Sequence, residues 1–209
     1  MRYLYIDTSS SYLYSAIVED NTLLAEVQEE FGQSLSEVTL PKISSMFEKA
    51  GLKPTDIDKI IVVNGPGSFT GIRIGITIAK VYAWTLKLPI TTIYSLEAMS
   101  LSTDDNKIHV PLINARRGYV YTAIYDENEK CLLKPQHMKL EDLCKELEKM
   151  DNYEFISNDE FDDLKEIIPY KPNMLKIVNY FKDKEAINPH AVNPEYLKLT
   201  EAEENKLWF

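Results

Sequence analysis

The sequence predicts an α/β protein built from two lobes around a cleft. Two observations support this prediction. The same order of predicted elements (three strands, a helix, a strand and a helix) occurs twice along the chain, and a polar stretch at Ser102–Asn106 separates the two halves. A length of 209 residues suits one large domain or two small ones. We therefore expect a first lobe over residues 1–103 and a second, shorter lobe over residues 104–209.

The strands of the first half fall into two groups. Three β-like runs open the chain and indicate an antiparallel meander, with a turn at Glu19-Asp20-Asn21. These runs cover Tyr3–Asp7, Leu13–Val18 and Leu23–Gln28. The later run Lys59–Val63 is almost entirely β-branched, which is typical of a strand buried on both faces.

Two helices are predicted beside these strands. Residues Ser34–Ala50 carry apolar side chains at helical spacing and end at Gly51, and we expect Pro41 to kink this helix. Residues Thr70–Lys87 are apolar on nearly all sides, so more than one side must be covered. Small residues recur at every fourth position of this helix and form a ridge that a neighbour approaches closely: Gly71, Gly75, Ala79 and Ala83. The sheet can cover one flank, and either the first helix or a second protein chain must cover the other.

The second half repeats this order with different residues. Its predicted elements are strands over Lys107–Asn114, Tyr119–Asp126 and Cys131–Leu133, a helix over Leu140–Met150, a strand over Tyr153–Ser157 and a helix over Met174–Lys184. The sequence therefore predicts a structural duplication.

The charge and the cysteine and histidine positions exclude several classes of function. Lys+Arg 23 against Asp+Glu 33 gives a net charge of −10, so the chain by itself should repel nucleic-acid phosphates. Two cysteines and three histidines lie at spacings that fit no metal site: Cys131, Cys144, His109, His137 and His190. Because no apolar run has the length of a signal peptide or a membrane span, we expect a cytoplasmic protein with reduced thiols and no membrane contact.

A glycine-rich segment, Asn64–Gly75, holds four of the seven glycines. Such a segment either binds phosphate with its backbone N–H groups or makes a sharp turn before a helix capped by Ser68 or Thr70. Thr70 stands where a dinucleotide fingerprint requires its third glycine, and Gly71 and Gly75 are each followed by isoleucine rather than the lysine of a P-loop. The common nucleotide motifs are therefore excluded.

Two further candidate sites flank the expected cleft. Asp7 precedes the run Thr8–Ser11, where it could face a phosphate and its magnesium, although an Asx turn explains the same residues and is favoured. Arg116 and Arg117 form the only adjacent basic pair and could bind an anion or an acidic partner, or simply be a solvated hairpin tip. The second half has a single glycine, so at best one half of a nucleotide cleft is present.

The glycine-rich motif Gly65–Gly75 resembles the signature of the bacterial TsaB (YeaZ) family. Further matches extend along the chain: Tyr5-Ile6-Asp7-Thr8-Ser9, Ser36-Glu37 before Leu40-Pro41-Lys42-Ile43, Tyr94–Ala98, Ala115-Arg116-Arg117 before Val120-Tyr121, and Pro194–Leu197. This resemblance implies the actin-like ATPase fold (ASKHA, ribonuclease H-like) that acetate kinase, Hsp70 chaperones and actin share.

The resemblance also implies a role in forming threonylcarbamoyladenosine at position 37 of tRNAs that read codons beginning with A. Family members are non-catalytic paralogues of the transferase TsaD, pair with it through first-lobe helices, and are joined by the small ATPase TsaE. The complex uses ATP or ADP and magnesium, whereas this chain is expected to bind no cofactor tightly and to meet tRNA only through the complex. A homodimer through the same face is expected when the partner is absent.

Two sets of residues follow from these expectations. The expected partner interface contains Leu35, Val38, Thr39, Ile43, Met46, Ile72, Gly75, Ile76, Ala79, Lys80 and Ala83. The motif loop, which could lie near a nucleotide, contains Asp7, Thr8, Gly65, Pro66, Gly67, Ser68, Phe69, Thr70, Gly71 and Arg73. No catalytic residue and no metal ligand is predicted.

Three positions depart from the family pattern. Leu35 replaces a frequent histidine, Asn114 replaces an aspartate, and Lys198 replaces a usual arginine. The alternative function is an ATP-dependent phosphotransferase of the same fold, with Asp7 at the magnesium and the Gly65 loop near the phosphates.

Overall fold

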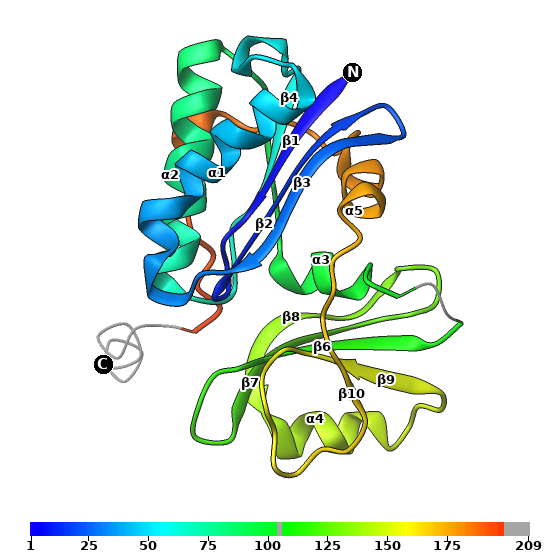
Figure 1. The fold of residues 1–209 in the computed structure, drawn as a ribbon. Coiled ribbons are helices and arrows are strands. Elements are labelled where there is room, and N and C mark those ends of the chain that lie inside the picture. Colours follow the sequence, from blue (N-terminus) through cyan, green and yellow to red (C-terminus); the bar gives the residue numbers. More distant parts are fainter. Residues whose placement is uncertain (104–105, 199–209) are drawn as a thin grey trace.

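The computed structural model describes residues 1–103 and 106–198; Asp104, Asp105 and residues 199–209, which include part of the predicted lobe boundary, lie outside this range. Two five-stranded sheets form the two lobes (Figure 1). The first sheet contains β1 (Arg2–Asp7), β2 (Tyr12–Glu19), β3 (Thr22–Glu30), β4 (Lys59–Val63) and β5 (Ile90–Ile93). The second contains β6 (Ile108–Asn114), β7 (Tyr119–Tyr125), β8 (Cys131–Lys139), β9 (Tyr153–Ile156) and β10 (Ile167–Ile168). The helices are α1 (Leu35–Ala50), α2 (Phe69–Leu86), α3 (Ser95–Ser100), α4 (Leu140–Leu147) and α5 (Met174–Phe181).

Both sheets have the same topology. The order is β3-β2-β1-β4-β5 in the first sheet and β10-β9-β6-β7-β8 in the second, so each half places its first strand at the centre. In each half the first three strands pair antiparallel, and the later strands join the centre in parallel. This duplicated arrangement confirms the predicted fold class.

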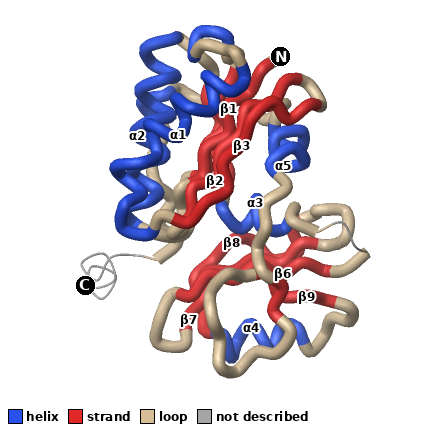
Figure 2. Tube along the Cα trace, viewed as in Figure 1, coloured by secondary structure: helices blue, strands red, loops and turns tan. Residues whose placement is uncertain are grey.

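The first sheet is covered on both faces, as the apolar strands predicted. Alternate residues of β1 point to opposite sides: Leu4 and Ile6 pack in the cluster with α1 and α2, whereas Tyr3 and Tyr5 pack with α3 and α5. Figure 2 shows α1 and α2 side by side on one face and α5 on the other. A continuous apolar strand therefore has a helix layer on each side.

Several elements differ from the sequence predictions. The predicted Cys131–Leu133 strand extends to Lys139, and β5 and α3 were not predicted at all. Four strand residues and six helical residues are too few to give a clear apolar period. A capping box over Tyr94–Glu97 starts α3, in which the Glu97 carboxylate accepts from the Tyr94 N–H at 2.8 Å.

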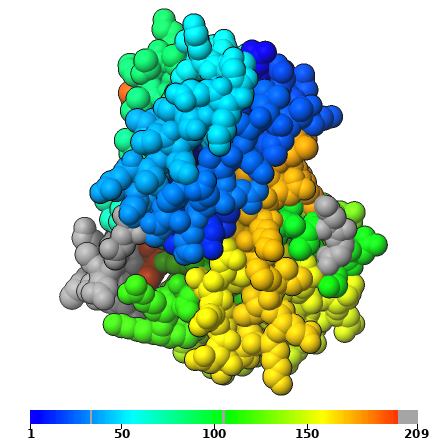
Figure 3. Space-filling model, viewed as in Figure 1, coloured from blue at the N-terminus to red at the C-terminus, as the bar shows by residue number. Residues whose placement is uncertain are grey.

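Helix α5 packs on the first lobe although it follows the second sheet in the sequence. Met174, Ile177, Val178 and Phe181 of α5 lie in the same buried cluster as Tyr5 of β1. Figure 3 shows this segment in orange between the blue first lobe and the yellow second lobe. The predicted division at 103/104 separates the two sheets but does not follow the packing of this C-terminal part.

The segment after α5, residues 187–196, is here called the strap, because it runs back along the first lobe. The Ile187 N–H donates to the carbonyl of Ile90 at 2.8 Å, and Val192 is fully buried in the cluster under α1 and α2. The Glu195 N–H donates to the carbonyl of Asn64 at 2.8 Å. The first lobe is therefore completed by the strap.

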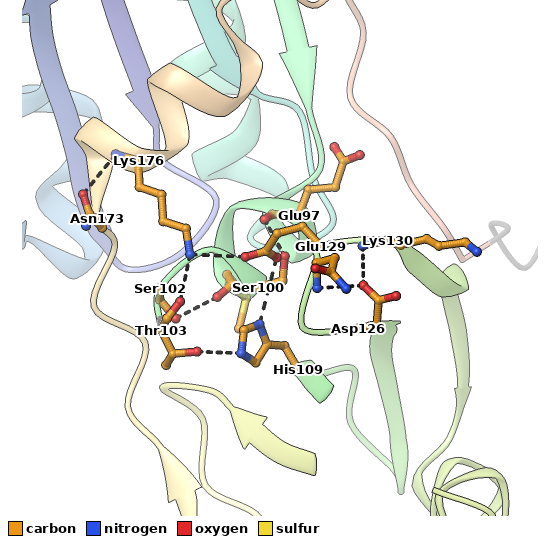
Figure 4. Close-up of polar contacts among 12 residues, drawn as sticks. Glu97, Ser100, Ser102, Thr103, His109, Asp126, Glu129, Lys130, Asn173 and Lys176 are labelled. Carbon is orange, nitrogen blue, oxygen red and sulfur yellow. Dashed lines mark hydrogen bonds and ion pairs between the residues drawn. The ribbon is translucent and has the colours of Figure 1, made fainter. Parts of the chain in front are cut away.

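A polar cluster fixes the chain where it crosses between the lobes (Figure 4). The Lys176 ammonium of α5 donates to the Thr103 carbonyl at 2.8 Å and to the Glu129 carboxylate at 3.2 Å. The Thr103 hydroxyl lies 2.8 Å from Nε2 of the buried His109. These contacts join α5, the crossing segment and the β7–β8 turn.

A search for membrane spans gives a negative result over the described ranges. Neither α2 nor any other helix there combines the length and the apolar character needed to cross a bilayer.

Candidate partner interface and interlobe cleft

The glycine-rich loop connects β4 to α2 and is closed by its own hydrogen bonds. Ser68 is the N-cap of α2, and its hydroxyl accepts the Gly71 N–H at 3.2 Å. The Ser68 N–H donates to the carbonyl of Ser9 at 2.6 Å, in the turn that follows β1. Ser95 holds the loop from α3, because its hydroxyl donates to the Pro66 carbonyl at 2.6 Å. Of the two residues predicted to cap the N-terminus of α2, Ser68 is the one that does so.

The glycines of the motif allow the β1–β2 turn to lie directly on α2. A Cβ atom at Gly67 would overlap the Ser9 carbonyl oxygen, one at Gly71 would overlap the Thr8 carbonyl oxygen, and one at Gly75 would overlap the Thr8 hydroxyl. The Thr8 hydroxyl donates to the Gly71 carbonyl at 2.6 Å. The small-residue ridge is therefore approached closely by the protein's own first turn.

Asp7 ends β1 and lies at the floor of the interlobe cleft. Its side chain accepts the Ser9 N–H at 2.8 Å and the Tyr5 hydroxyl at 3.4 Å, and the residue is almost completely buried. Burial raises the pKa of Asp7 above its ordinary value because the carboxylate loses water, although the hydrogen bonds from Ser9 and Tyr5 oppose this shift. The contact with Ser9 is the Asx turn that the sequence favoured.

Part of the motif loop beside Asp7 is already occupied by the protein's own groups. The Ser68 N–H, which would face a phosphate, already donates to Ser9, and the turn of Thr8 and Ser9 fills the space between β1 and α2. Within residues 1–103 and 106–198, no group of three or more His, Cys, Asp or Glu side chains could hold a metal ion. We therefore derive no phosphate chemistry from this loop.

A cavity of about 930 Å³ separates the two lobes. Its first-lobe wall includes Asp7, Ser10 and Phe69, and its second-lobe wall includes Asn114 and Tyr121. Hydroxyl and amide groups dominate this lining. The cleft predicted between the lobes is therefore present.

Most of the expected partner-interface residues are buried inside the first lobe. Nine of the eleven are covered: Leu35, Thr39, Ile43, Met46, Ile72, Gly75, Ile76, Ala79 and Ala83. Val38 and Lys80 are half-buried. Because the apolar period of each helix marks the side that faces the sheet, these nine positions identify the core rather than the accessible face. In the single chain the ridge residues Gly75 and Ala79 are already covered by the protein itself.

The accessible face of the helix pair carries other apolar residues. Leu40 of α1 is 48% exposed, and Val81 and Trp84 of α2 are 59% and 63% exposed. Ile74 and Ile78 of α2 are half-buried toward α1. Sequence reasoning missed Leu40, Val81 and Trp84; the available signal was that they are apolar at positions out of phase with the core stripe. We call Leu40, Ile74, Ile78, Val81 and Trp84 the exposed helix face.

The strap covers the other flank of α2. The Lys80 ammonium donates to the Val192 carbonyl at 3.0 Å, and Trp84 contacts His190 with ring centroids 4.3 Å apart. Near the N-terminus of α2, the Arg73 guanidinium lies 3.7 Å from the Phe69 ring centroid and donates to the Tyr196 hydroxyl at 3.0 Å. The strap therefore covers part of this flank of α2, and Val81 and Trp84 remain more than half exposed beside it.

Comparison with known proteins assigns the chain to a family. Residues 25–181 match the family model described as TsaD: tRNA N6-adenosine threonylcarbamoyltransferase. The chain is 31% identical to the Bacillus subtilis tRNA threonylcarbamoyladenosine biosynthesis protein TsaB, over 97% of this chain and 96% of that protein. The chain belongs to the TsaB (YeaZ) family. The resemblance carried by the motif Gly65–Gly75 is thus confirmed.

Further relatives agree with this assignment. The Escherichia coli protein of the same description is 31% identical over 70% of this TsaB-family chain and 69% of its own length. A structure described as YeaZ from Pseudomonas aeruginosa has a TM-score of 0.76, covers 94% of this chain and 99% of its own, and is 18% identical. A second Pseudomonas aeruginosa structure, described as an uncharacterised protein similar to peptidase YeaZ, has a TM-score of 0.79, the same coverage and 18% identity. At this identity the two structures establish the shared fold.

The remaining predicted residues of this TsaB-family chain lie at the cleft mouth or on the helices. Arg116 and Arg117 are exposed at the β6–β7 hairpin tip. The Asn114 side chain stabilises the hairpin turn, because its oxygen accepts the Arg116 N–H at 2.8 Å. Leu35 is buried at the start of α1, and Lys198 is exposed just after the strap.

Proposed function

We propose that this TsaB-family chain is a non-catalytic subunit in the formation of threonylcarbamoyladenosine in tRNA. In this proposal it pairs with a TsaD-type catalytic protein through the exposed helix face, and a TsaE-type ATPase joins the pair. The relatives' descriptions supply the pathway, and the geometry of the helix pair supplies the surface.

The exposed helix face is the observation that carries this proposal. Val81 and Trp84 are more than half exposed on α2, and Leu40 is nearly half exposed on α1. Lys80 lines a hollow together with Val81 and Trp84, and both Arg73 and Lys80 donate to the strap, which leaves these two cations partnered. Apolar residues of this size on two adjacent helices favour closure against a second helix pair.

The non-catalytic role is supported by the closed motif loop. The Thr8–Ser9 turn occupies the space beside α2, and the Ser68 N–H already donates to the Ser9 carbonyl. ATP, ADP and magnesium would then be bound by other members of the complex. In that arrangement the closed loop positions α2 for pairing rather than binding a ligand.

The proposal is tested by incorporation of labelled threonine into tRNA with purified pathway proteins. The complete mixture contains threonine, bicarbonate, ATP, the TsaD and TsaE proteins of the same organism, and this chain. We expect product to disappear when this chain is omitted and none to form when it replaces TsaD. Full product without this chain would contradict the proposal.

An ATP-dependent phosphotransferase is the second candidate function. Its support is the position of Asp7 beside a large interlobe cavity. Titration calorimetry of the isolated chain with ATP and magnesium separates the two candidates. We expect no heat of binding, whereas tight binding would favour the phosphotransferase.

We also propose that the exposed helix face forms a homodimer when the partner is absent, because like apolar surfaces can cover each other. Addition of the TsaD protein should then convert the homodimer to a heterodimer. Light scattering measures both states.

A further inference from the structure

The hairpin that joins β6 to β7 holds two adjacent arginines in an uncommon conformation. Arg116 has φ of 66°, Arg117 has φ of 54° and Gly118 has φ of 76°. The left-handed region is costly for residues other than glycine, and arginine gains nothing locally by adopting it. The turn is nevertheless well defined, because Ala115 N–H donates to the Tyr119 carbonyl at 2.9 Å and Tyr119 N–H donates to the Arg116 carbonyl at 3.0 Å. Both arginines are exposed at the tip of the hairpin. The β6–β7 hairpin itself lies at the lower left in Figure 1.

The charges of these two arginines are not compensated within the described part of the chain. No carboxylate there forms an ion pair with either guanidinium. The nearby Asp159 carboxylate instead accepts the backbone N–H of Asn114 at 2.7 Å. In a chain of net charge −10, an uncompensated arginine pair indicates a surface for a negatively charged ligand.

Aromatic side chains continue this surface along the strands. Tyr119 stacks on His137, with ring centroids 4.8 Å apart and planes 7° apart, and Tyr121 contacts the same ring at 5.2 Å. The register pairs Tyr119 with Lys139 and Tyr121 with His137, so all four residues lie on one face of the sheet. That face is opposite to α4, because the intervening Val120 packs in the cluster with α4.

This surface opens into the interlobe cavity. Arg116 and Tyr121 line the cavity from the second lobe, and Phe69 lines it from the first. The three side chains of Tyr119, Tyr121 and His137 are half-buried, so their rings are held in place while part of each remains accessible. We call Arg116, Arg117, Tyr119, Tyr121, His137 and Lys139 the hairpin surface.

We propose that the hairpin surface contacts a single-stranded loop of the tRNA, with the two guanidinium groups on phosphates and the aromatic rings against bases. Single-stranded RNA is recognised by arginine and by stacking on aromatic rings, and this surface places both within one hairpin. The inference rests on the proposed function, which supplies tRNA as the ligand. Because the rest of the chain is acidic, this contact supplements tRNA binding by the catalytic partner and does not replace it.

The test compares matched variants in the complex with the TsaD protein. Binding of a fluorescein-labelled anticodon stem-loop, from a tRNA that reads codons beginning with A, is followed by anisotropy at several KCl concentrations. The variant Arg116→Asn/Arg117→Asn removes both charges with a residue that tolerates left-handed backbone. We expect affinity to fall by at least about fivefold and the salt dependence to decrease by about one phosphate contact per arginine.

Two further substitutions separate stacking from charge. Tyr119→Leu should weaken binding by at least about fivefold, whereas Tyr119→Phe should retain it, because base stacking requires the ring and not the hydroxyl. The control Lys145→Gln/Lys149→Gln makes the same charge change at two exposed, ion-paired lysines, one in α4 and one just after it. We expect this control to bind like the wild type. Melting temperatures establish that each variant is folded.

The outcomes distinguish this inference from the proposed function. Pairing with TsaD is measured separately by size-exclusion chromatography, and a wild-type chain that does not pair contradicts the proposed function. In that case the RNA contact is tested separately, by crosslinking a stem-loop that contains 4-thiouridine to the isolated chain at low salt. A crosslink within residues 115–121 or at His137 supports the contact. Unchanged RNA binding by the Arg116→Asn/Arg117→Asn variant would overturn the inference. If that variant loses binding to the TsaE protein and not to RNA, the arginines bind an acidic protein instead.

Discussion

The hydroxyl of Thr8 donates to the carbonyl of Gly71 at 2.6 Å, and the carbonyl of Thr8 occupies the space where a side chain at residue 71 would begin. This single relationship joins the end of β1 to the first turn of α2. It fixes the orientation of the helix whose outer side is exposed. It also closes the loop that the sequence left open to phosphate.

Gly71→Ala is expected to destabilise the protein by about 2–3 kcal/mol, because the new methyl group would overlap a backbone oxygen. At an exposed helical site the change from glycine to alanine stabilises a protein by up to about 1 kcal/mol. A loss of stability would therefore show that the close approach of Thr8 outweighs this helix preference. Urea unfolding measures the effect. Thr70→Ala, at an exposed neighbouring position, is the control.

Gly75→Ala is expected to behave differently from Gly71→Ala when Thr8 is changed. At Gly75 the conflict is with the Thr8 hydroxyl, so Thr8→Ala should remove most of the cost of Gly75→Ala. At Gly71 the conflict is with the Thr8 backbone, so the same change should bring no rescue. Equal coupling in the two double-mutant cycles would contradict this account.

Val81→Glu and Leu40→Glu are expected to weaken pairing with the TsaD protein by at least about tenfold, because each would bury an unpaired carboxylate in the interface. Both positions are about half exposed in the single chain, so the melting temperature should change little. Leu132→Glu, on β8 of the second lobe and 45% exposed, is the matched control. Pairing that survives both helix substitutions would place the interface elsewhere.

Asp7→Asn is expected to become more stabilising as the pH rises. Burial raises the pKa of Asp7 above its ordinary value of 3.8, so the protonated carboxyl is favoured in the folded state. The stability that this proton supplies is present below the unfolded pKa and is lost as the pH rises through the folded pKa. Asparagine resembles the protonated form at every pH and still accepts the Ser9 N–H.

Urea midpoints between pH 4 and pH 8 measure this difference. Asp20 provides a control without pH dependence in this range, because the N-terminal ammonium at 2.7 Å lowers the pKa of its exposed carboxyl below the ordinary 3.8 and its stability contribution is lost only at lower pH. A pH-independent difference between Asp7→Asn and the wild type would show that burial of the charge does not affect stability.

Val192→Ala is expected to destabilise the first lobe by about 2 kcal/mol, although residue 192 lies in the second half of the sequence. Val192 is fully buried among residues of α1, α2 and β1. Glu185→Ala, at an exposed position before the strap, should change stability by less than about 0.5 kcal/mol. Equal effects of the two substitutions would show that the strap does not complete the first lobe.

Local patterns were sufficient for most elements. Lys59–Val63 is a strand with the predicted bounds, and α1 ends before Gly51, which adopts φ of 66° as a left-handed cap. Elements that are very short, or that depend on contacts with distant parts of the sequence, were harder to predict. The six residues of α3 are stabilised by contacts with β6 and β7, which lie later in the sequence.

The sequence by itself determined the duplicated element order, the family and the position of the glycine loop, because hydrophobic period and turn chemistry are local properties. Only the tertiary structure decided which side of each helix is accessible. The small-residue ridge of α2 indicated a close neighbour, and the fold shows that this neighbour is Thr8. Leu40, Val81 and Trp84 are among the apolar residues that remain exposed, and they could be separated from the core only after the sheet and the strap had covered the other sides. Burial depends on what packs against a residue, and for α2 that includes a segment more than a hundred positions away, as the contact of Lys80 with Val192 shows.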